Sequence, residues 1–164
     1  PGLQGTSDRC RETEYSLWSR EPEAGILNAC RELGVGFVPY SPLGAFLTGK
    51  ITDPGVFAED DFRRNLPRFQ AETMRKNQLL LERLQQVATR YDATLAQIAL
   101  AWVMSKGEDI VPIPGARKIA HLRDNAGREI TLSPEDILTI EDIFTPDNVT
   151  GLRYNQGDFN LIEK

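Results

Sequence analysis

Two hydrophobic periods alternate along the chain. Short apolar runs typical of buried strands occur at 14–18, 35–40 and 110–113. Apolar residues spaced three or four positions apart, as in amphipathic helices, recur at about 22–33, 73–91, 94–106, 118–126 and 134–144. Strand and helix signals in alternation predict an α/β fold, with a parallel sheet and outer crossover helices.

The ends of the predicted helices carry typical capping residues. We expect Gly34 to end the first helix in the left-handed conformation. Thr94 and Gln97 have the spacing of a capping box, and Ser133 followed by Pro134 is a typical helix start. The sequence therefore predicts helix boundaries close to these residues.

Four of the predicted helices have an apolar stripe that we expect to face the core. The stripe residues are Ile26, Leu27, Cys30 and Leu33; Leu79, Leu80, Leu84, Val87 and Ala88; Ile98, Ala99, Trp102 and Val103; and Ile137, Leu138, Ile140 and Phe144. The run 35–40 is continuously apolar, so we expect a strand buried on both faces. Residues 41–72 show no sustained period and predict a long loop with a short helical turn.

Three parallel strands leave two sheet edges without a partner. Such a sheet is either small and open or an arc of a (β/α)₈ barrel, which normally needs roughly 250 residues. The arc fits the order of elements better. We therefore predict a single domain over 1–164, a partial (β/α)₈ TIM barrel with parallel strands and outer helices. Residues 145–164 are predicted to be a polar surface tail, and the exposed edges favour self-association.

Composition limits the classes of partner. With 164 residues, 40% of them hydrophobic, 26% charged, and a net charge of −5, the chain is not expected to bind nucleic acid or anionic lipid. The apolar run 95–104 is too short to span a membrane, and the N-terminus has no secretory pattern. Cys10 and Cys30 are too few for a disulfide scaffold and lack metal spacing, so we expect a reducing, cytoplasmic location.

The segment that follows the run 110–113 is the clearest candidate site. Gly115 would let the backbone approach a ligand, and the next helix begins with free N–H groups. Arg117 and Lys118 lie at the positive end of that helix, where the dipole disfavours cations by up to about 1 kcal/mol. An anion bound between them would explain the arrangement. The alternative is that both side chains extend into water.

Further residues could extend this site. His121, Asp124 and Asn125 share one helix face and could reach a ribose or an adenine, although a lone exposed histidine is more often solvated.

A second candidate segment follows the strand at 35–40. Tyr40 lies at the C-terminal rim of the sheet, where it could stack on a flat heterocycle or cap the core. Ser41 and Lys50 could contact a pyrophosphate, although a serine before proline is also ordinary turn chemistry. The pair Arg63 and Arg64 could close over a phosphate or remain solvated.

Several catalytic motifs are missing from the sequence. It has no Gly-x-Gly-x-x-Gly, no Walker loop and no Gly-x-Ser-x-Gly, so neither a Rossmann fingerprint nor a hydrolase elbow is expected. No His, Cys and carboxylate cluster has metal spacing. Because His121 is the single histidine, we expect no Ser/His/Asp triad, and we assign no catalytic residue and no metal ligand.

Four segments resemble motifs of the aldo-keto reductases, most of all the bacterial members related to potassium-channel β subunits. They are EYSLWSRE at 14–21, PYSPLG with FLTGK at 39–44 and 46–50, RRNLPRF at 63–69 and IPGAR at 113–117. The match extends from about Thr13 to the end of the chain and would be the C-terminal half of the family's barrel. Residues 1–12 are expected to be divergent or disordered.

The resemblance implies NADPH bound in extended form without a Rossmann fold. Tyr40 would stack on the nicotinamide, and of the pair Arg63 and Arg64 our candidate for the loop over the cofactor is Arg64. The other implied contacts are Ser41, Pro42, Leu43 and Lys50 along the pyrophosphate, and Gly115, Arg117, His121, Asp124 and Asn125 at the adenosine and its 2′-phosphate.

The family's reaction is hydride transfer to an aldehyde or ketone carbonyl, assisted by a tyrosine acid with lysine, aspartate and histidine. The resemblance places those four residues in the N-terminal half of the family's chain. We therefore expect this chain to be a truncated, cofactor-binding half that is inactive alone. The alternatives are a non-catalytic nucleotide-binding or regulatory module and an unrelated phosphate-binding β/α protein.

Overall fold

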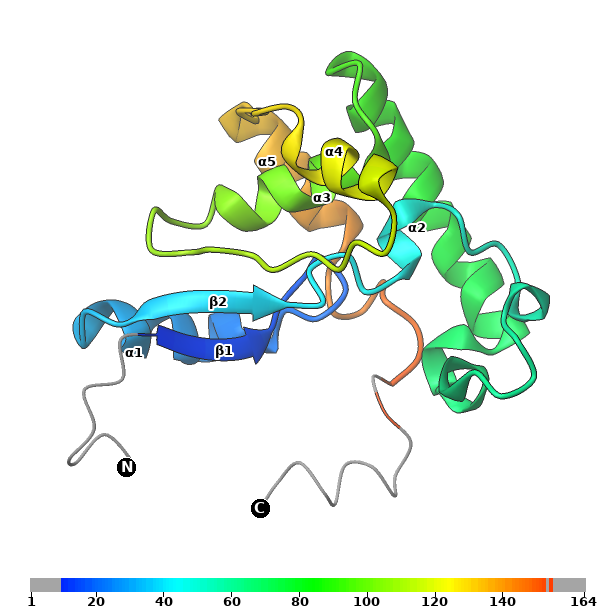
Figure 1. Ribbon diagram of the computed structural model, residues 1–164. Helices are drawn as coiled ribbons and strands as arrows, with labels where there is room; N and C mark the ends of the chain where they lie inside the picture. Colours follow the sequence, from blue (N-terminus) through cyan, green and yellow to red (C-terminus); the bar gives the residue numbers. More distant parts are fainter. Residues whose placement is uncertain (1–9, 153, 155–164) are drawn as a thin grey trace.

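The computed structural model describes residues 10–152 and 154, and their architecture is α/β, as predicted. The described part contains two strands and five α-helices: β1 (Cys10–Glu14), α1 (Ile26–Glu32), β2 (Gly36–Tyr40), α2 (Ala71–Arg90), α3 (Leu95–Met104), α4 (Ile119–Ala126) and α5 (Pro134–Ile143). In Figure 1, α3, α4 and α5 lie together on one side of β2, and the long helix α2 lies beside them. None of these helices is long and apolar enough to cross a bilayer.

β1 and β2 pair in parallel along their whole length. The register runs from Cys10 opposite Gly36 to Glu14 opposite Tyr40. The predicted strand at 14–18 is therefore wrong by about four residues. After Glu14 the chain turns, because the Ser16 hydroxyl accepts hydrogen bonds from the backbone N–H groups of Trp18 and Ser19, each at 3.2 Å. Such local bonds compete with a sheet ladder.

Residues 110–113 lie beside β2, as predicted, but only as two isolated bridges. Ile110 bridges to Phe37 and Ile113 to Tyr40. Between these two bridges, the backbone N–H of Val111 donates to the Phe37 carbonyl at 2.9 Å. Pro112 has no N–H to donate, so the ladder is interrupted at its centre.

One face of the sheet is open within the described residues. Phe37 and Pro39 are buried, whereas Val38 and Tyr40, on the other face, are only half-buried. Val111 and Ile113 are 61% and 47% exposed. The expectation that the run 35–40 is buried on both faces was wrong, because Val38 and Tyr40 are only half-buried. This open face, with Val38, Tyr40, Val111 and Ile113 on it, is called the open sheet face below.

The helices follow the local sequence signals closely. Gly34 has φ of 63°, in the left-handed region. Thr94 and Gln97 form both hydrogen bonds of a capping box, and the Ser133 hydroxyl accepts from the backbone N–H of Asp136 at 3.1 Å. The stripe predictions hold for most positions. They were wrong at residues that instead lie outside the core: Ile26, Leu33, Leu79 and Leu138.

The long segment between β2 and α2 is folded onto the turn after β1. It contains four short 3₁₀ helices: η2 (Phe46–Thr48), η3 (Pro54–Val56), η4 (Phe62–Asn65) and η5 (Pro67–Phe69). Trp18 lies 4.4 Å from Phe46 and 6.2 Å from Phe69, measured between ring centroids. This aromatic packing explains how a segment without hydrophobic period becomes ordered.

The C-terminal part of the described chain returns to α2. The Asn77 amide donates to the Thr150 carbonyl at 2.8 Å and accepts from the Thr150 N–H at 2.9 Å. Residues 10–12, expected to be divergent or disordered, belong to β1. The predictions for 1–9 and for 155–164 fall outside the described residues.

Candidate functional site

The candidate site begins where β2 ends. Tyr40 is its last residue and is half-buried on the open sheet face. Ser41 follows with φ of 49°, a conformation uncommon for residues other than glycine. Its carbonyl accepts from the Gly44 N–H at 2.8 Å, which closes a tight turn. Strained residues of this kind concentrate at functional sites, so the turn makes this rim a candidate ligand-binding site.

The residues after this turn differ in accessibility. Pro42 and Leu43 are buried and could contribute only a fixed surface and backbone groups to a ligand. Ser41 and Lys50 are exposed. Lys50 makes no ion pair within the described residues, so its ammonium group can bind an external anion.

The two adjacent arginines of η4 have different environments. Arg63 donates to Asp61 Oδ1 at 2.9 Å and Oδ2 at 2.5 Å, and its guanidinium lies 4.5 Å from the Phe57 ring centroid. Arg64 is exposed and has no ion pair among the residues that the structure describes. Arg64 is therefore the arginine of this pair that is free to bind a ligand.

Arg117, in the segment before α4, interacts electrostatically with Asp61 at the start of η4. Hydrogen bonds from Arg63 lower the pKa of Asp61 to about 2, and the charge of Arg117 acts in the same direction. Arg63 and Arg117, one from each of the two predicted basic segments at 63–64 and 117–118, thus act on the same carboxylate.

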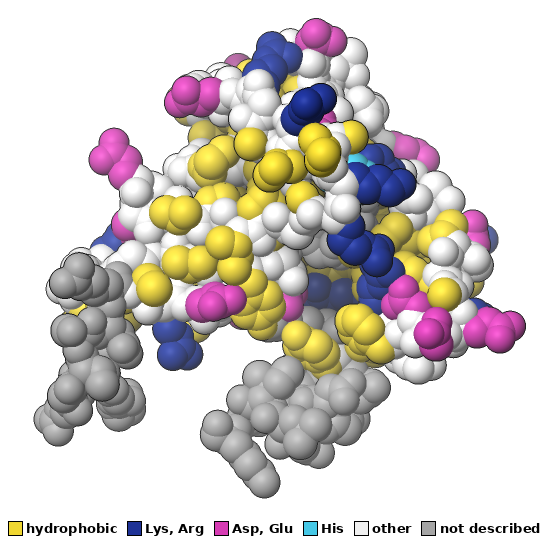
Figure 2. All heavy atoms as spheres, in the orientation of Figure 1, with side chains coloured by type: hydrophobic (Ala, Val, Ile, Leu, Met, Phe, Trp, Pro, Cys, Tyr) yellow, Lys and Arg dark blue, Asp and Glu magenta, His cyan; other side chains and the backbone are white. Residues whose placement is uncertain are grey.

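Figure 2 shows these basic groups on the surface. Lys and Arg side chains gather in a band beside the histidine, between α4 and the segment after β2, and they border a hollow. Arg117 and Lys118 are exposed, and neither has an ion pair within 10–152. Several neighbouring cations that are not paired with carboxylates make a site suited to phosphate groups.

The start of α4 adds backbone donors to this band. Lys118 is the N-cap residue, and no side chain caps the helix. Gly115 does not have a positive φ, and no atom lies within 4 Å of the position that a Cβ would occupy on it. The fold therefore does not require glycine at this position, and the space in front of it is open to a ligand.

The three residues predicted along α4 are all half-buried but differ in their partners. The Asp124 carboxylate accepts from the Thr94 hydroxyl at 3.4 Å, and its carbonyl accepts from the Gln97 amide at 3.0 Å. His121 and Asn125 have no side-chain hydrogen bond to any described residue. Asp124 therefore helps to fix α4 on α3, while the other two side chains remain available.

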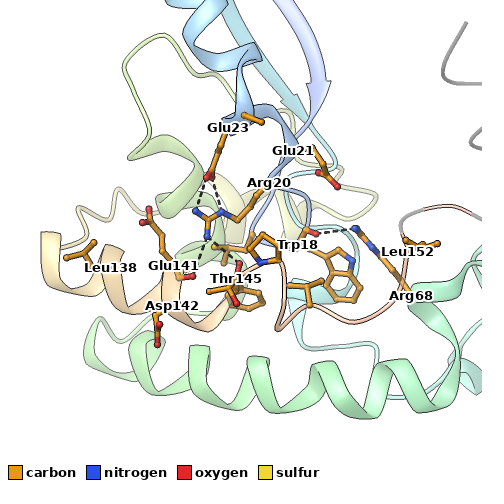
Figure 3. Close-up of a pocket in the computed structure, with 16 residues that line it drawn as sticks. Trp18, Arg20, Glu21, Glu23, Arg68, Leu138, Glu141, Asp142, Thr145 and Leu152 are labelled. Atoms are coloured by element: carbon orange, nitrogen blue, oxygen red, sulfur yellow. Dashed lines mark hydrogen bonds and ion pairs between the residues drawn. The ribbon is translucent and has the colours of Figure 1, made fainter.

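A separate groove of about 870 Å³ lies between the turn after β1 and the end of α5 (Figure 3). None of the predicted site residues lines it. Its Arg20 binds the Glu23 carboxylate at 2.8 Å and donates to the carbonyls of Glu141 and Phe144, each at 3.3 Å. The charge of Arg20 is thus already paired, which makes the groove a poor phosphate site.

Tyr15 and the possible metal ligands are further candidates for reactive groups of the described chain. Tyr15 is fully buried and donates to Glu23 at 2.7 Å. Burial, and next the hydrogen bond to Glu23, raise the pKa of Tyr15 far above its ordinary value. Within the described residues no three His, Cys, Asp or Glu side chains are grouped as a metal would need.

Arg68 is a buried charged group that the sequence analysis missed. Arg68, in η5, is only 8% exposed and lies against Ser19 and Trp18. No periodicity signals it, because its partners are distant in sequence. The only hint was its place in the segment RRNLPRF.

Comparison with known proteins identifies the family of this arrangement. The sequence model of the Aldo/keto reductase family matches residues 9–144. "Probable aldo-keto reductase 1" of Glycine max is 45% identical over 148 residues, covering 89% of this chain and 42% of the relative. The aldo-keto reductase yakc of Schizosaccharomyces pombe, whose name includes NADP(+), is 40% identical over 151 residues, covering 89% and 44%.

A solved structure shows the same fold. The glycerol dehydrogenase of Gluconobacter oxydans matches with a TM-score of 0.71 and 25% identity, over 80% of this chain and 41% of that one. The predicted partial barrel is thereby confirmed. The chain spans less than half the length of the relatives it matches.

Proposed function

The chain belongs to the aldo/keto reductase family, and we propose that it is the cofactor-binding part of an NADPH-dependent enzyme that reduces aldehydes or ketones. The observation that carries the proposal is the band of Lys and Arg side chains that borders a hollow beside the histidine. The electrostatic effect of Arg117 on Asp61, next to Arg63, supports it. The NADP(+) in the name of the Schizosaccharomyces pombe relative supports the choice of cofactor.

The residues present fit a dinucleotide phosphate. Tyr40 offers a half-buried aromatic ring at the rim of the sheet, against which a nicotinamide can stack. Lys50 and the exposed side of the turn at Ser41 suit a pyrophosphate. Arg64 and Arg117, which form no ion pair within 4 Å in the described chain, suit the 2′-phosphate, since guanidinium groups bind phosphate oxygens through paired N–H donors. When bound, NADPH would supply the hydride.

We propose further that this chain alone does not reduce a carbonyl. We assign none of its residues as the proton donor, in accordance with the buried state of Tyr15. Loss of general acid catalysis typically lowers a rate by about 10²–10⁴-fold. A complete reaction would thus require acid groups from outside these residues, together with a small carbonyl substrate.

The open sheet face supports self-association of the chain, and the free thiols support a reducing, cytoplasmic location. Exposed apolar side chains at Val111 and Ile113, next to an unpaired strand edge, favour association of the chain with a second copy. The free thiols of Cys10 and Cys30 accord with a reducing, cytoplasmic compartment.

Titration with NADPH and with NADH, followed by tryptophan fluorescence, tests the proposal. Trp18 packs within 4 Å of the position that a Cβ on Gly44 would occupy, in the turn after Tyr40, so it should report binding. We expect tighter binding of NADPH than of NADH. If neither NADPH nor NADH changes the tryptophan fluorescence, the chain is a phosphate-binding protein of another kind and the proposal is contradicted.

The regulatory alternative needs a different assay. Addition of the N-terminal half of a close relative, followed by measurement of aldehyde-dependent NADPH oxidation, should restore activity if this chain is part of an enzyme. Binding of NADPH without any restored activity would instead support a non-catalytic module.

A further inference from the structure

Arg68 is a charged side chain with almost no contact with solvent. It is 8% exposed, and arginine is rarely buried to this extent unless its donors are paired. Nη1 donates to the Ser19 hydroxyl at 2.9 Å and Nη2 donates to the Trp18 carbonyl at 3.1 Å. The guanidinium also lies 5.2 Å from the Trp18 ring centroid. Figure 3 shows Arg68 directed toward Trp18.

These contacts continue to the end of β1. The Ser19 hydroxyl donates to Glu14 Oε1 at 2.8 Å, and the same carboxylate oxygen is 3.9 Å from Arg68 Nη1. Glu14 is 8% exposed and is the register partner of Tyr40. A buried chain of polar contacts therefore joins η5 to the strand end beside the proposed nicotinamide-stacking residue.

The neighbouring 3₁₀ helix η4 has few attachments of its own. Phe62 is 69% exposed, and Arg63 binds Asp61 within the same turn. Arg64 is held through its carbonyl, which accepts from the Gln70 amide at 2.8 Å. Since Gln70 itself adjoins η5, the position of Arg64 depends on where η5 is fixed.

We propose that Arg68 is a positioning residue that holds Arg64 over the cofactor-binding rim by fixing η5 to Ser19 and Glu14. This inference rests on the proposed function. It assigns to Arg68 a part in forming the phosphate site for NADPH. Arg68 does not touch the cofactor. Because its partners lie at the end of β1, it sets the distance between the basic loop and Tyr40.

A double-mutant cycle on NADPH affinity tests this role. Arg68→Met removes the donors, and we expect NADPH to bind about tenfold more weakly. Arg64→Met should produce a loss of similar size in the wild-type background and less than a twofold further loss in Arg68→Met. Arg68→Lys, which keeps the charge but cannot reach both acceptors equally well, should have an intermediate effect.

Two further variants separate positioning from general loss of structure. Arg83→Met removes a surface pair with Asp142 at 3.5 Å and should leave NADPH affinity unchanged. Ser19→Ala removes only the bridging hydroxyl, and it should reduce the effect of Arg64→Met even if Arg68→Met does not fold. Circular dichroism establishes which variants are folded.

The outcomes are distinct. If Arg64→Met weakens binding by the same factor in every background, Arg68 does not act through Arg64 and the inference fails while the proposed function stands. If Arg68→Met folds and binds NADPH as well as wild type does, the inference also fails. If wild type binds no NADPH, both the inference and the proposed function are contradicted.

Discussion

At the scale of single residues, pairing divides the arginines of this chain into two groups. Arg20, Arg63 and Arg68 are held by carboxylates or carbonyls of the chain itself. Arg64 and Arg117 lack such partners within the described residues. A paired arginine must give up an existing contact before it binds a ligand, so the second group is better suited to phosphate recognition.

This division predicts different effects of two substitutions. Arg117→Ala should weaken NADPH binding by roughly tenfold to a hundredfold, the range expected for one charge-assisted hydrogen bond. Arg63→Ala should have a much smaller effect, because that guanidinium is already bound to Asp61. Calorimetric titration at low and high salt measures both. Equal losses in the two variants would contradict the division.

The hydrogen bonds to the Asp136 carboxylate lead us to expect that the stability of the fold depends on pH. Its carboxylate accepts from the Tyr91 hydroxyl at 2.6 Å, and it is also bound by Arg90 and Ser133. These hydrogen bonds, that from Tyr91 foremost, lower the pKa of Asp136. The contribution of the Asp136 carboxylate to the free energy of unfolding is therefore complete above its unfolded pKa of about 3.9. It is lost as the pH falls through the lower pKa of the folded state.

Asp136→Asn should remove this part of the acid sensitivity and lower the free energy of unfolding at pH 7 by about 1 kcal/mol. The control is Asp142→Asn, since Asp142 is in an exposed pair with Arg83. Urea denaturation between about pH 1.5 and pH 6, a range that spans the loss of a carboxylate contribution below its unfolded pKa, measures both. An unchanged pH profile in Asp136→Asn would show that the hydrogen bonds contribute nothing.

At the scale of elements, Gly34 and Gly115 together test whether a positive φ makes glycine necessary after a helix. Gly34 has φ of 63° after α1 and no atom near a Cβ position, so alanine there would meet conformational strain alone. Gly34→Ala should lower stability by about 1 kcal/mol. Gly115→Ala, where φ is not positive and the space is open, should leave stability unchanged. Thermal denaturation distinguishes them, and equal effects would contradict this explanation.

The elements show which signals can be read from sequence. Helix ends at Gly34, Thr94 and Ser133 were predicted because each depends on residues within four positions of one another. The strand at 14–18 was misplaced because the side-chain bonds of Ser16 favour a turn, which apolar content does not reveal. The regularity of 110–113 was overestimated because Pro112 lies in its centre.

Some residues of the candidate site could likewise be identified from the sequence, and others could not. Tyr40 and Arg117 could be identified because each lies at a strand or helix end with recognisable local sequence. The choice of Arg64 over Arg63 needed the position of Asp61, and the role of Arg68 needed its contact with Ser19. Contacts between distant segments have no period and no motif, so only the structure provides them.

At the scale of the whole molecule, the open sheet face is the main departure from a self-contained fold. The chain covers 42–44% of the length of its curated relatives. Further barrel strands would join the edge of the sheet that borders this face. Exposed apolar side chains at sheet edges favour association.

We therefore predict that the isolated chain self-associates as its concentration rises. Val111→Glu, which places a charge on the open sheet face at a 61% exposed position, should weaken this association without unfolding the chain. Leu79→Glu, on the exposed side of α2 with 61% exposure, is the control. Sedimentation velocity over a range of concentrations compares them. A monomeric wild type would contradict the prediction.

The central claim is that phosphate groups of NADPH bind between η4 and the segment before α4. A crystal structure of the chain with NADPH tests this claim most directly. We expect a phosphate within hydrogen-bond distance of both Arg64 and Arg117, with the nicotinamide ring against Tyr40. NADPH bound instead in the groove beside Arg20, or with its phosphates away from both arginines, would contradict it.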